Sequence, residues 1–315
     1  MSKSKKILTL IMTTAIMLSN VGATNALTVS NIKKLYGDNR YSTASEIAGE
    51  YGNYDTVILV NADNNNFADG LSASGLAGVT KSPILLTHKD TIPNETQLRL
   101  DVAKKIYLIG NEGTISKNLE TQLRNVGEFQ VKRLGGINRF DTSVKIANEI
   151  KTFKPNINRV YIANGYTGQI DALSISPLAA KNGEPIILTN GKVLDKDSNK
   201  VISTIGKRYV IGGTNIVENT LMNKIKAERV SGNDRFSTNA NVVKKFYPNQ
   251  TGFYISDAYK LVDSLTGGPL AGKNSRPIVF VSQNSNKSIF KVAKNITSFG
   301  NVDQGILNSV AKATN

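Results

Sequence analysis

The sequence contains no cysteine, no tryptophan and only one histidine in 315 residues. Without cysteine the protein has no disulfide bonds, so its stability must come from packing. Zinc hydrolases usually take at least two His or Cys ligands, so one histidine argues against a zinc site. We expect this residue, His88, in a surface loop, because no Ser-His-Asp arrangement accompanies it in the pattern of the chain. The sequence indicates neither a metal nor any other cofactor.

Acidic residues are also scarce, with 24 Asp and Glu against 39 Lys and Arg, which gives a net charge of +15. Part of this charge lies at the start, where Lys3, Lys5 and Lys6 precede an apolar run at residues 7–18 and small residues that end at Ala23 or Ala26. This pattern predicts a signal peptide at residues 1–26. The apolar run is shorter than the roughly 20 residues of a membrane span. We therefore expect a secreted protein with no membrane span after signal cleavage.

The mature chain stays strongly basic, which bears on its partners. An exported protein rarely meets nucleic acid, so an anionic cell-surface polymer or a lipid headgroup is the expected partner. The alternative is that the positive charge only keeps the protein soluble. The pattern of the sequence does not indicate an oligomeric state.

A repeated pattern organises the rest of the chain. An Asp-x-Leu-(Ser/Thr) motif precedes, by 14 positions each time, a proline that opens an apolar run. A Gly-x-x-Arg-(Tyr/Phe)-x-Thr motif lies upstream of each copy. Such a constant register predicts three copies of one unit, at residues 27–131, 132–227 and 228–315. The recurring acids are Asp69, Asp171 and Asp263, the recurring arginines are Arg40, Arg139 and Arg235, and the prolines are Pro83, Pro185 and Pro277.

Within each unit, strand-like and helix-like segments alternate. Continuous apolar runs at residues 57–60, 84–86 and 106–109 are typical of strands buried on both faces, as in a parallel sheet. Helical periodicity is present at residues 41–51. Alternation of this kind predicts a Rossmann-like or flavodoxin-like α/β fold with helices on both faces of the sheet. No Gly-x-Gly-x-x-Gly follows a first strand, so the fold does not imply a dinucleotide.

The recurring polar residues allow two interpretations each. The three aspartates can cap the helices that they begin, or they can bind a ligand or act as catalytic acids. The three arginines can pair with the Asp of their own unit, or contact an anionic ligand directly. The apolar run after each proline is either core or part of a seam between units. We also expect the helix after each arginine to be capped by Ser42, Asp141 or Ser237.

Taken together, these motifs resemble the clostridial cell-wall-binding repeat 2 family over nearly all of the mature chain. The resemblance implies three Rossmann-like units in a pseudo-threefold triangular arrangement. It also implies attachment to the Gram-positive cell wall through an anionic secondary polymer, a polysaccharide or a teichoic-acid-like chain. An Ile-Leu-Leu motif is associated with that binding in the family. It maps to Ile84, Leu85 and Leu86, more loosely to Ile186, Ile187 and Leu188, and in divergent form to Ile278, Val279 and Phe280.

We therefore expect a non-enzymatic protein of the cell wall or cell surface, with three binding repeats and no separate effector domain. Several weak sites on one frame would bind a repeating polymer by avidity. The alternatives are a wall-active hydrolase or amidase-modifying protein, and a surface-layer component or adhesin. Because the third repeat diverges most, we expect Arg139 to matter more for binding than Arg235.

Overall fold

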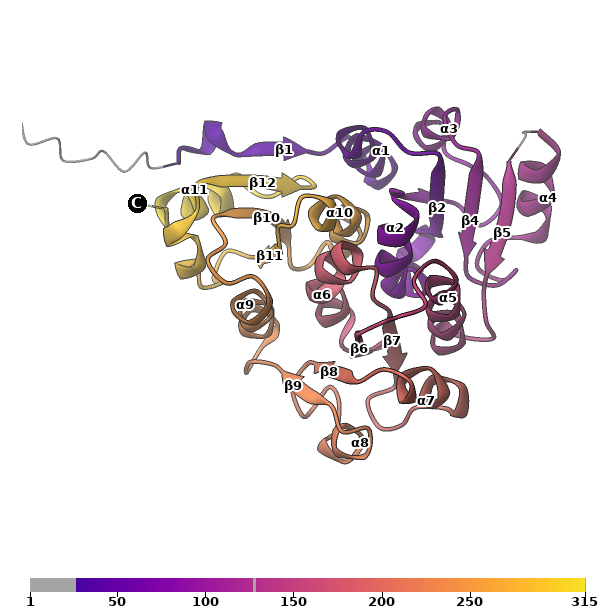
Figure 1. Cartoon of the computed structure of the whole chain (residues 1–315). Helices are drawn as coiled ribbons and strands as arrows, with labels where there is room; N and C mark the ends of the chain where they lie inside the picture. Colours follow the sequence, from indigo (N-terminus) through magenta and orange to yellow (C-terminus); the bar gives the residue numbers. More distant parts are fainter. Residues whose placement is uncertain (1–26, 127–128, 315) are drawn as a thin grey trace, which may run out of the picture.

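The computed structural model describes residues 27–126 and 129–314. Three four-stranded parallel sheets lie at the corners of a triangle, around helices that meet at its centre (Figure 1). The predicted α/β fold of three parallel-sheet repeats in a pseudo-threefold arrangement is confirmed. The predicted signal peptide lies outside the described residues. Within the described ranges, every helix is too short or too polar to cross a bilayer.

Each sheet has the strand order of the first part of a flavodoxin fold. In the first sheet the order is β3-β2-β4-β5. The first strand, β2, therefore lies inside the sheet, with β3 on one side and β4 and β5 on the other. Its strands are β2 (Thr56–Asn61), β3 (Ile84–Thr87), β4 (Lys105–Ile109) and β5 (Gln130–Leu134). Its helices are α1 (Arg40–Tyr51), α2 (Ser74–Thr80), α3 (Asn94–Leu100) and α4 (Lys117–Val126), with short 3₁₀ turns η2 (Asp63–Asn65) and η3 (Ala68–Ser72).

The second and third sheets repeat this order. The second is β7-β6-β8-β9 and the third is β11-β10-β12-β1. The second unit contains α5 (Arg139–Phe153), β6 (Arg159–Asn164), α6 (Gln169–Asn182), β7 (Ile186–Thr189), α7 (Lys196–Ser203), β8 (Lys207–Ile211), α8 (Asn219–Lys224) and β9 (Glu228–Val230). The third contains α9 (Arg235–Phe246), β10 (Gly252–Asp257), α10 (Leu261–Lys273), β11 (Ile278–Val281), η4 (Ser288–Val292), β12 (Asn295–Phe299) and α11 (Gln304–Lys312). The chain starts with η1 (Val29–Asn31) and β1 (Lys33–Leu35).

The fourth strand of each sheet leads directly into the next sequence repeat. Strand β5 pairs with β4 and β9 pairs with β8, although both lie at limits between sequence repeats. Strand β1, from the start of the described chain, pairs in parallel with β12 and completes the third sheet. The ring of three units is thereby closed by backbone hydrogen bonds. The limits at residues 131/132 and 227/228 thus mark the sequence repeat, whereas β5 and β9 belong to the preceding sheet.

Small residues let the central helices α2, α6 and α10 pack closely (Figure 1). A methyl group on Gly78 of α2 would overlap the carbonyl oxygen of Ala180 in α6. One on Gly272 of α10 would come within 2.6 Å of the Ala180 side chain. The Gly, Ala and Ser content of these segments, already evident in the sequence, therefore permits backbone contact at the centre of the triangle.

The predicted caps of three helices are wrong. The helix caps are Asn39, Asn138 and Asp234, three residues before the predicted positions, and their side chains accept backbone N–H groups. Ser42 and Ser237 instead complete capping boxes as the third helical residue.

Candidate functional site: the seams between units

The Gly-x-x-Arg-(Tyr/Phe)-x-Thr motif forms the start of helices α1, α5 and α9. The threonine hydroxyl accepts the N–H of the motif glycine, at 3.1 Å in units 1 and 2 and 2.9 Å in unit 3. At the glycine, a β-carbon would collide with the third helical residue in all three units. The motif therefore fixes a tight loop and places its arginine as the first helical residue, at the edge of the unit.

The arginines do not form ion pairs with the Asp of their own unit. In the described residues, no Lys or Arg nitrogen lies within 4.0 Å of an oxygen of Asp69, Asp171 or Asp263, which corrects the predicted internal pairing. Arg40 donates to the Ala62 carbonyl at 2.5 Å, and Arg139 donates to the Gly165 carbonyl at 2.6 Å.

Aromatic rings lie beside two of these arginines. The Arg139 guanidinium lies 4.6 Å from the centroid of the Tyr166 ring, and that of Arg235 lies 5.4 Å from the Tyr259 ring. Both tyrosines are exposed. Carbonyl oxygens or exposed rings therefore orient the three guanidinium groups. The remaining N–H donors of each group stay available for a ligand.

The aspartates lie in the first turn of the central helices, but they do not cap them. No side-chain cap hydrogen bond is formed at the start of η3, α6 or α10, so the predicted capping role is wrong. Each carboxyl instead lies against the glycine that follows the third strand of its unit. These glycines, Gly110, Gly212 and Gly300, have positive φ angles of 111°, 121° and 76°. A side chain there would be strained and would strike the carboxyl.

At two of the three seams between units, the aspartate of one unit lies near the arginine of the next. Burial raises the pKa of Asp171 to about 7, and Arg235 of the third unit partly offsets this rise. Burial raises the pKa of Asp263 to about 6, partly offset by Lys260 and by Arg40 of the first unit. Helices α9 and α1 pack against α6 and α10, which explains why these partners come from different repeats.

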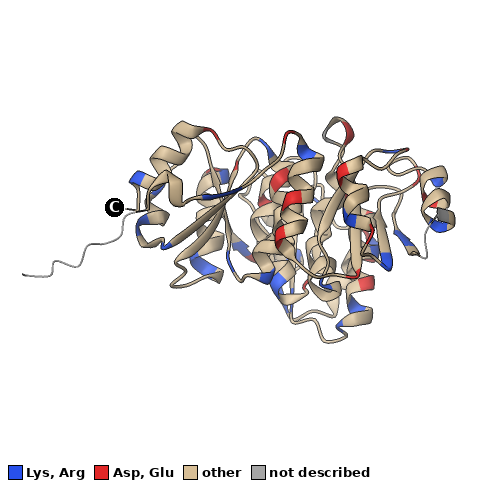
Figure 2. Cartoon of the chain, turned by 90° about the horizontal axis from the view of Figure 1, so that it is seen from above, with Lys and Arg blue, Asp and Glu red and all other residues tan. Residues whose placement is uncertain are grey.

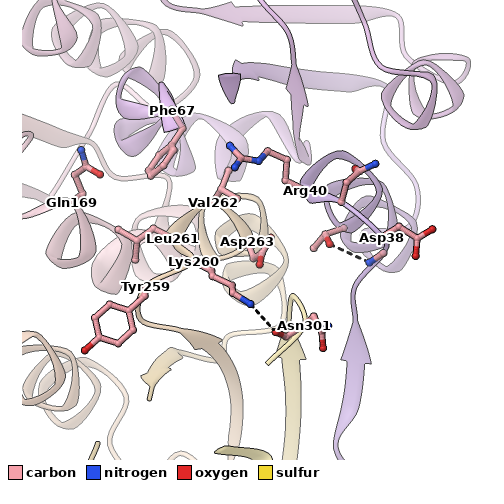
Figure 3. A pocket seen from close by; sticks show the side chains of 13 residues that line it. Asp38, Arg40, Phe67, Gln169, Tyr259, Lys260, Leu261, Val262, Asp263 and Asn301 are labelled. Carbon is pink, nitrogen blue, oxygen red and sulfur yellow. Dashed lines mark hydrogen bonds between the residues drawn. The ribbon is translucent and has the colours of Figure 1, made fainter. Parts of the chain in front are cut away.

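The cleft between units 3 and 1, here the 3–1 cleft, has a volume of about 450 Å³ (Figure 3). Arg40 and Asp263 line it together with Lys260, whose ammonium donates to the Asn301 carbonyl at 3.4 Å. Tyr259, which is 70% exposed, stands at its edge. The cleft thus combines two cations, two aspartates, Asp38 and Asp263, and an exposed ring, and its cations can bind the anionic groups of a sugar chain.

The corresponding cleft between units 2 and 3, the 2–3 cleft, measures about 650 Å³. Arg235 and Asp171 line it in the same relation as Arg40 and Asp263. The Asp171 side chain is only 4% exposed, and no hydrogen bond reaches its carboxyl from the part of the chain that the structure describes. The hydrogen-bonding capacity of this buried carboxyl group is therefore available to a ligand in the cleft.

The seam between units 1 and 2 is bridged by the side chain of Asn111, which donates to the Gly136 carbonyl at 3.1 Å. Within unit 1, Thr114 donates to Asp69 at 3.1 Å. At the position of Thr114, unit 2 has Ile216. Asp69 therefore has the internal partner that Asp171 and Asp263 lack. Arg235 lines a cleft with an aspartate of this kind, Asp171. The expected ranking of Arg139 above Arg235 for binding stays a prediction.

The Ile-Leu-Leu positions are core in this structure. Each of the nine side chains is at most 4% exposed. They lie in β3, β7 and β11, the edge strands of the three sheets, which helices α1, α5 and α9 cover. The core and seam interpretations are thus compatible, whereas direct contact of these side chains with a ligand stays a prediction. The nine are Ile84, Leu85, Leu86, Ile186, Ile187, Leu188, Ile278, Val279 and Phe280.

Sequence patterns missed several residues of the clefts. Lys260 has no counterpart of the same type in the other units, so no repeated signal marks it. Asn301 has one, Asn111, in the first unit only. The glycine against which each aspartate lies (Gly110, Gly212 or Gly300) does recur. Its recurrence together with the Asp motif could have indicated where the seams lie. His88 is a loop residue as predicted, although its Nδ1 lies 2.5 Å from Asp63 and 3.0 Å from the hydroxyl of Tyr41.

The fold and its seams define a class of three-repeat α/β binding modules. The family model for Cell wall binding domain 2 (CWB2) matches residues 34–120, 133–222 and 229–306. The chain therefore belongs to this family of cell wall binding domains, as the sequence motifs predicted. Membership implies a location at the cell wall or cell surface.

Curated relatives carry the same region within longer proteins. The N-acetylmuramoyl-L-alanine amidase LytC of Bacillus subtilis is 31% identical over 283 residues, which cover 87% of this chain and 55% of that protein. The Amidase enhancer of the same organism is 33% identical over 267 residues, 83% of this chain and 36% of that protein. The chain thus spans about half or less of the length of these relatives.

Solved structures from Clostridium difficile show the same fold. Cwp6 is similar with a TM-score of 0.82 and 33% sequence identity, over 90% of this chain and 47% of that one. Cwp8 has a TM-score of 0.80 and 30% identity, over 90% of this chain and 51% of that one. These similarities support the arrangement of three sheets as well as the family assignment.

Proposed function

We propose that this protein attaches to the cell wall, without catalysis, by binding an anionic wall polymer in the 3–1 and 2–3 clefts. The polymer would be an acidic polysaccharide or a teichoic-acid-like chain. One observation carries the proposal: in both clefts, the arginine of one unit faces an aspartate of its neighbour that has no hydrogen-bond partner in the described chain. The cell wall binding family supports it.

The two side chains would have complementary roles. The guanidinium of Arg40 or Arg235 can bind two oxygens of a phosphate or carboxylate group at once. A protonated Asp263 or Asp171 can donate a hydrogen bond to a sugar hydroxyl or to an anionic oxygen. Because their raised pKa values favour the neutral form in mildly acidic solution, these aspartates need not repel an anionic polymer.

Two clefts on one rigid frame would also act together. Once one cleft holds the polymer, the second meets a high local concentration of the same repeating ligand. Lys and Arg residues, which are spread over all three units (Figure 2), would add a long-range attraction that salt screens. The predicted signal peptide would deliver the protein to the outside of the cell. The amidase-related and adhesin-like alternatives stay predictions that no specific geometry of the clefts favours.

Co-sedimentation with purified, protein-free cell walls tests the proposal. Wild-type protein should pellet with intact walls and stay in solution once the anionic polymer has been extracted. Raised salt should weaken the interaction. Equal retention on intact and extracted walls would refute polymer binding, and a loss of turbidity of the wall suspension would instead indicate a hydrolase.

Wall retention should weaken as the pH rises from 5 to 8. Protonated Asp171 and Asp263 predominate below their pKa values of about 7 and 6, and the charged forms that appear above them repel an anionic ligand. Retention should therefore drop several-fold across this window. The double variant Asp171→Asn/Asp263→Asn should keep its binding at pH 8, which co-sedimentation at constant ionic strength would measure.

The matched control is Asp69→Asn, because Asp69 is bonded to Thr114 in the bridged seam. This variant should show the same pH dependence as the wild type. The raised pKa values also act on folding: their stabilising contribution is complete below about pH 4 and is lost as the pH rises through 6 to 7. Unfolding measured at each pH separates this effect from binding. A wild-type retention that stays flat from pH 5 to 8 would contradict the role of the aspartates.

A further inference from the structure

A second cavity lies at the opposite end of the central helices from the seam clefts. It has a volume of about 480 Å³, within the range of small-ligand sites. Its lining includes Gly78, Ala180 and Gly272, from the last turns of α2, α6 and α10. Along α6, the ten residues from Asp171 to Lys181 separate it from the 2–3 cleft by about 15 Å. We call it the axial cavity, since all three units contribute to it.

One lysine from each unit lines the axial cavity: Lys81, Lys181 and Lys273. All three are exposed, and no Asp or Glu is among the lining residues. Three carboxylates lie within three residues of the lining along the chain. Glu50 is paired with Lys33 at 2.7 Å, Glu184 is paired with Arg159 at 3.0 Å, and Asp55 accepts a hydrogen bond from Thr56 at 3.0 Å. The cavity therefore gathers three positive charges with no carboxylate to balance them.

Compensation of helix dipoles explains only part of this cluster. Lysines near helix C-termini commonly bond the last carbonyl groups. Lys273 does so in this sense: its ammonium donates to the Tyr51 carbonyl and lies 4.4 Å from the centroid of the Tyr51 ring. Lys181 has only a distant ring neighbour, Tyr247 at 6.0 Å. In the part of the chain that the structure describes, the ammonium groups of Lys81 and Lys181 have no hydrogen-bond acceptor.

The backbone conformation at Lys81 is separate evidence that this lysine serves the cavity. Lys81 has a φ angle of 51°, in the left-handed region that favours glycine. The position two residues before the proline holds Gly183 in unit 2, with φ 60°, and Ser275 in unit 3, with φ 54°. A lysine costs about 1 kcal/mol more than glycine in this conformation. Folding alone thus favours glycine at this place, whereas a lysine supplies a charge to the cavity.

We propose that the axial cavity is a second anion site, which binds a phosphate group through Lys81 and Lys181, with Lys273 adding positive charge. Lysine ammonium groups are common phosphate ligands. The phosphate could come from a free compound such as pyrophosphate or from a phosphodiester within a polymer. This site is separate from the clefts, and its existence does not depend on the function proposed for them.

The test compares four proteins: the wild type, Lys81→Gly, Lys181→Gln and Lys226→Gly. Lys226 is a matched control, since it is an exposed lysine with the same φ angle of 51° and does not line the cavity. Both glycine variants remove one charge and relieve the same strain, so both should fold at least as stably as the wild type. Calorimetric titration would measure binding of sodium pyrophosphate and, separately, of bis(glycerol) phosphate, at constant ionic strength.

We expect the wild type and Lys226→Gly to bind alike, and Lys81→Gly and Lys181→Gln to bind at least about tenfold more weakly, as for the loss of a charge-assisted hydrogen bond. Binding of pyrophosphate alone would assign the site to free phosphate compounds, and binding of the diester with the same dependence would assign it to a phosphodiester polymer. No binding of either probe to the wild type, or equal binding by all four proteins, would overturn the proposal. Neither result would alter the wall-binding test, which measures sedimentation.

Discussion

Gly78→Ala is expected to lower the free energy of unfolding by about 3 kcal/mol, the upper end of the usual cost of overpacking. The added methyl group would overlap the carbonyl oxygen of Ala180, a backbone atom that cannot move aside without shifting α6. In an open helix the same change would stabilise the protein by roughly 1 kcal/mol. The sign of the effect thus reports whether α2 and α6 touch. Denaturant unfolding, followed by circular dichroism, measures it.

Gly206→Ala is the control for this substitution. A β-carbon at Gly206 would meet no atom within 4 Å, and its φ angle is not in the left-handed region. We expect a change of less than about 1 kcal/mol, neutral or stabilising. If Gly78→Ala were as stable as Gly206→Ala, the close central contact of the three units would be wrong.

The double variant Arg40→Ala/Arg235→Ala should bind intact walls about a hundredfold more weakly than the wild type. Each substitution removes a charge-assisted interaction that corresponds to roughly a tenfold change in affinity. The two losses combine because Arg40 and Arg235 line separate clefts. Co-sedimentation at a series of wall concentrations gives the apparent affinity.

Arg139→Ala is the matched control for both single substitutions. It removes the same charge from the same helical position, and it breaks a hydrogen bond to Gly165 like that of Arg40 to Ala62. It lies, however, at the seam that Asn111 bridges and whose aspartate, Asp69, already has Thr114 as a partner. Its affinity should stay within about threefold of the wild type, as for an exposed charge. A loss at Arg139 as large as at Arg40 or Arg235 would show that the clefts are not the binding sites.

The strands were predictable because their signal is local. The runs at residues 57–60, 84–86 and 106–109 fall within β2, β3 and β4, whose side chains are buried almost throughout. Helix faces are less certain from apolar residues alone: Leu98 and Val102, which follow Pro93 at helical spacing, are 70% and 60% exposed. This helix, α3, ends at Leu100, so a longer helical periodicity did not apply to it.

The sequence showed which polar residues recur, but not which partners they meet. Asp171 was expected to cap its helix or to pair with Arg139, and it instead faces Arg235. The reason is that α9, the first helix of the third unit, packs against α6 of the second. A repeated pattern shows that two residues recur together, and it does not show whether they meet within one copy or between successive copies.

The sequence by itself determined the number of repeats, the parallel α/β fold of each and the membership of a cell wall binding family, since these follow from local patterns in constant register. Only the tertiary structure decided which repeat supplies each half of a cleft, that β1 closes the ring by pairing with β12, and that two seams are open while one is bridged. Those features depend on contacts between distant segments and on single side chains such as Asn111. Such contacts arise only once the three units have packed together.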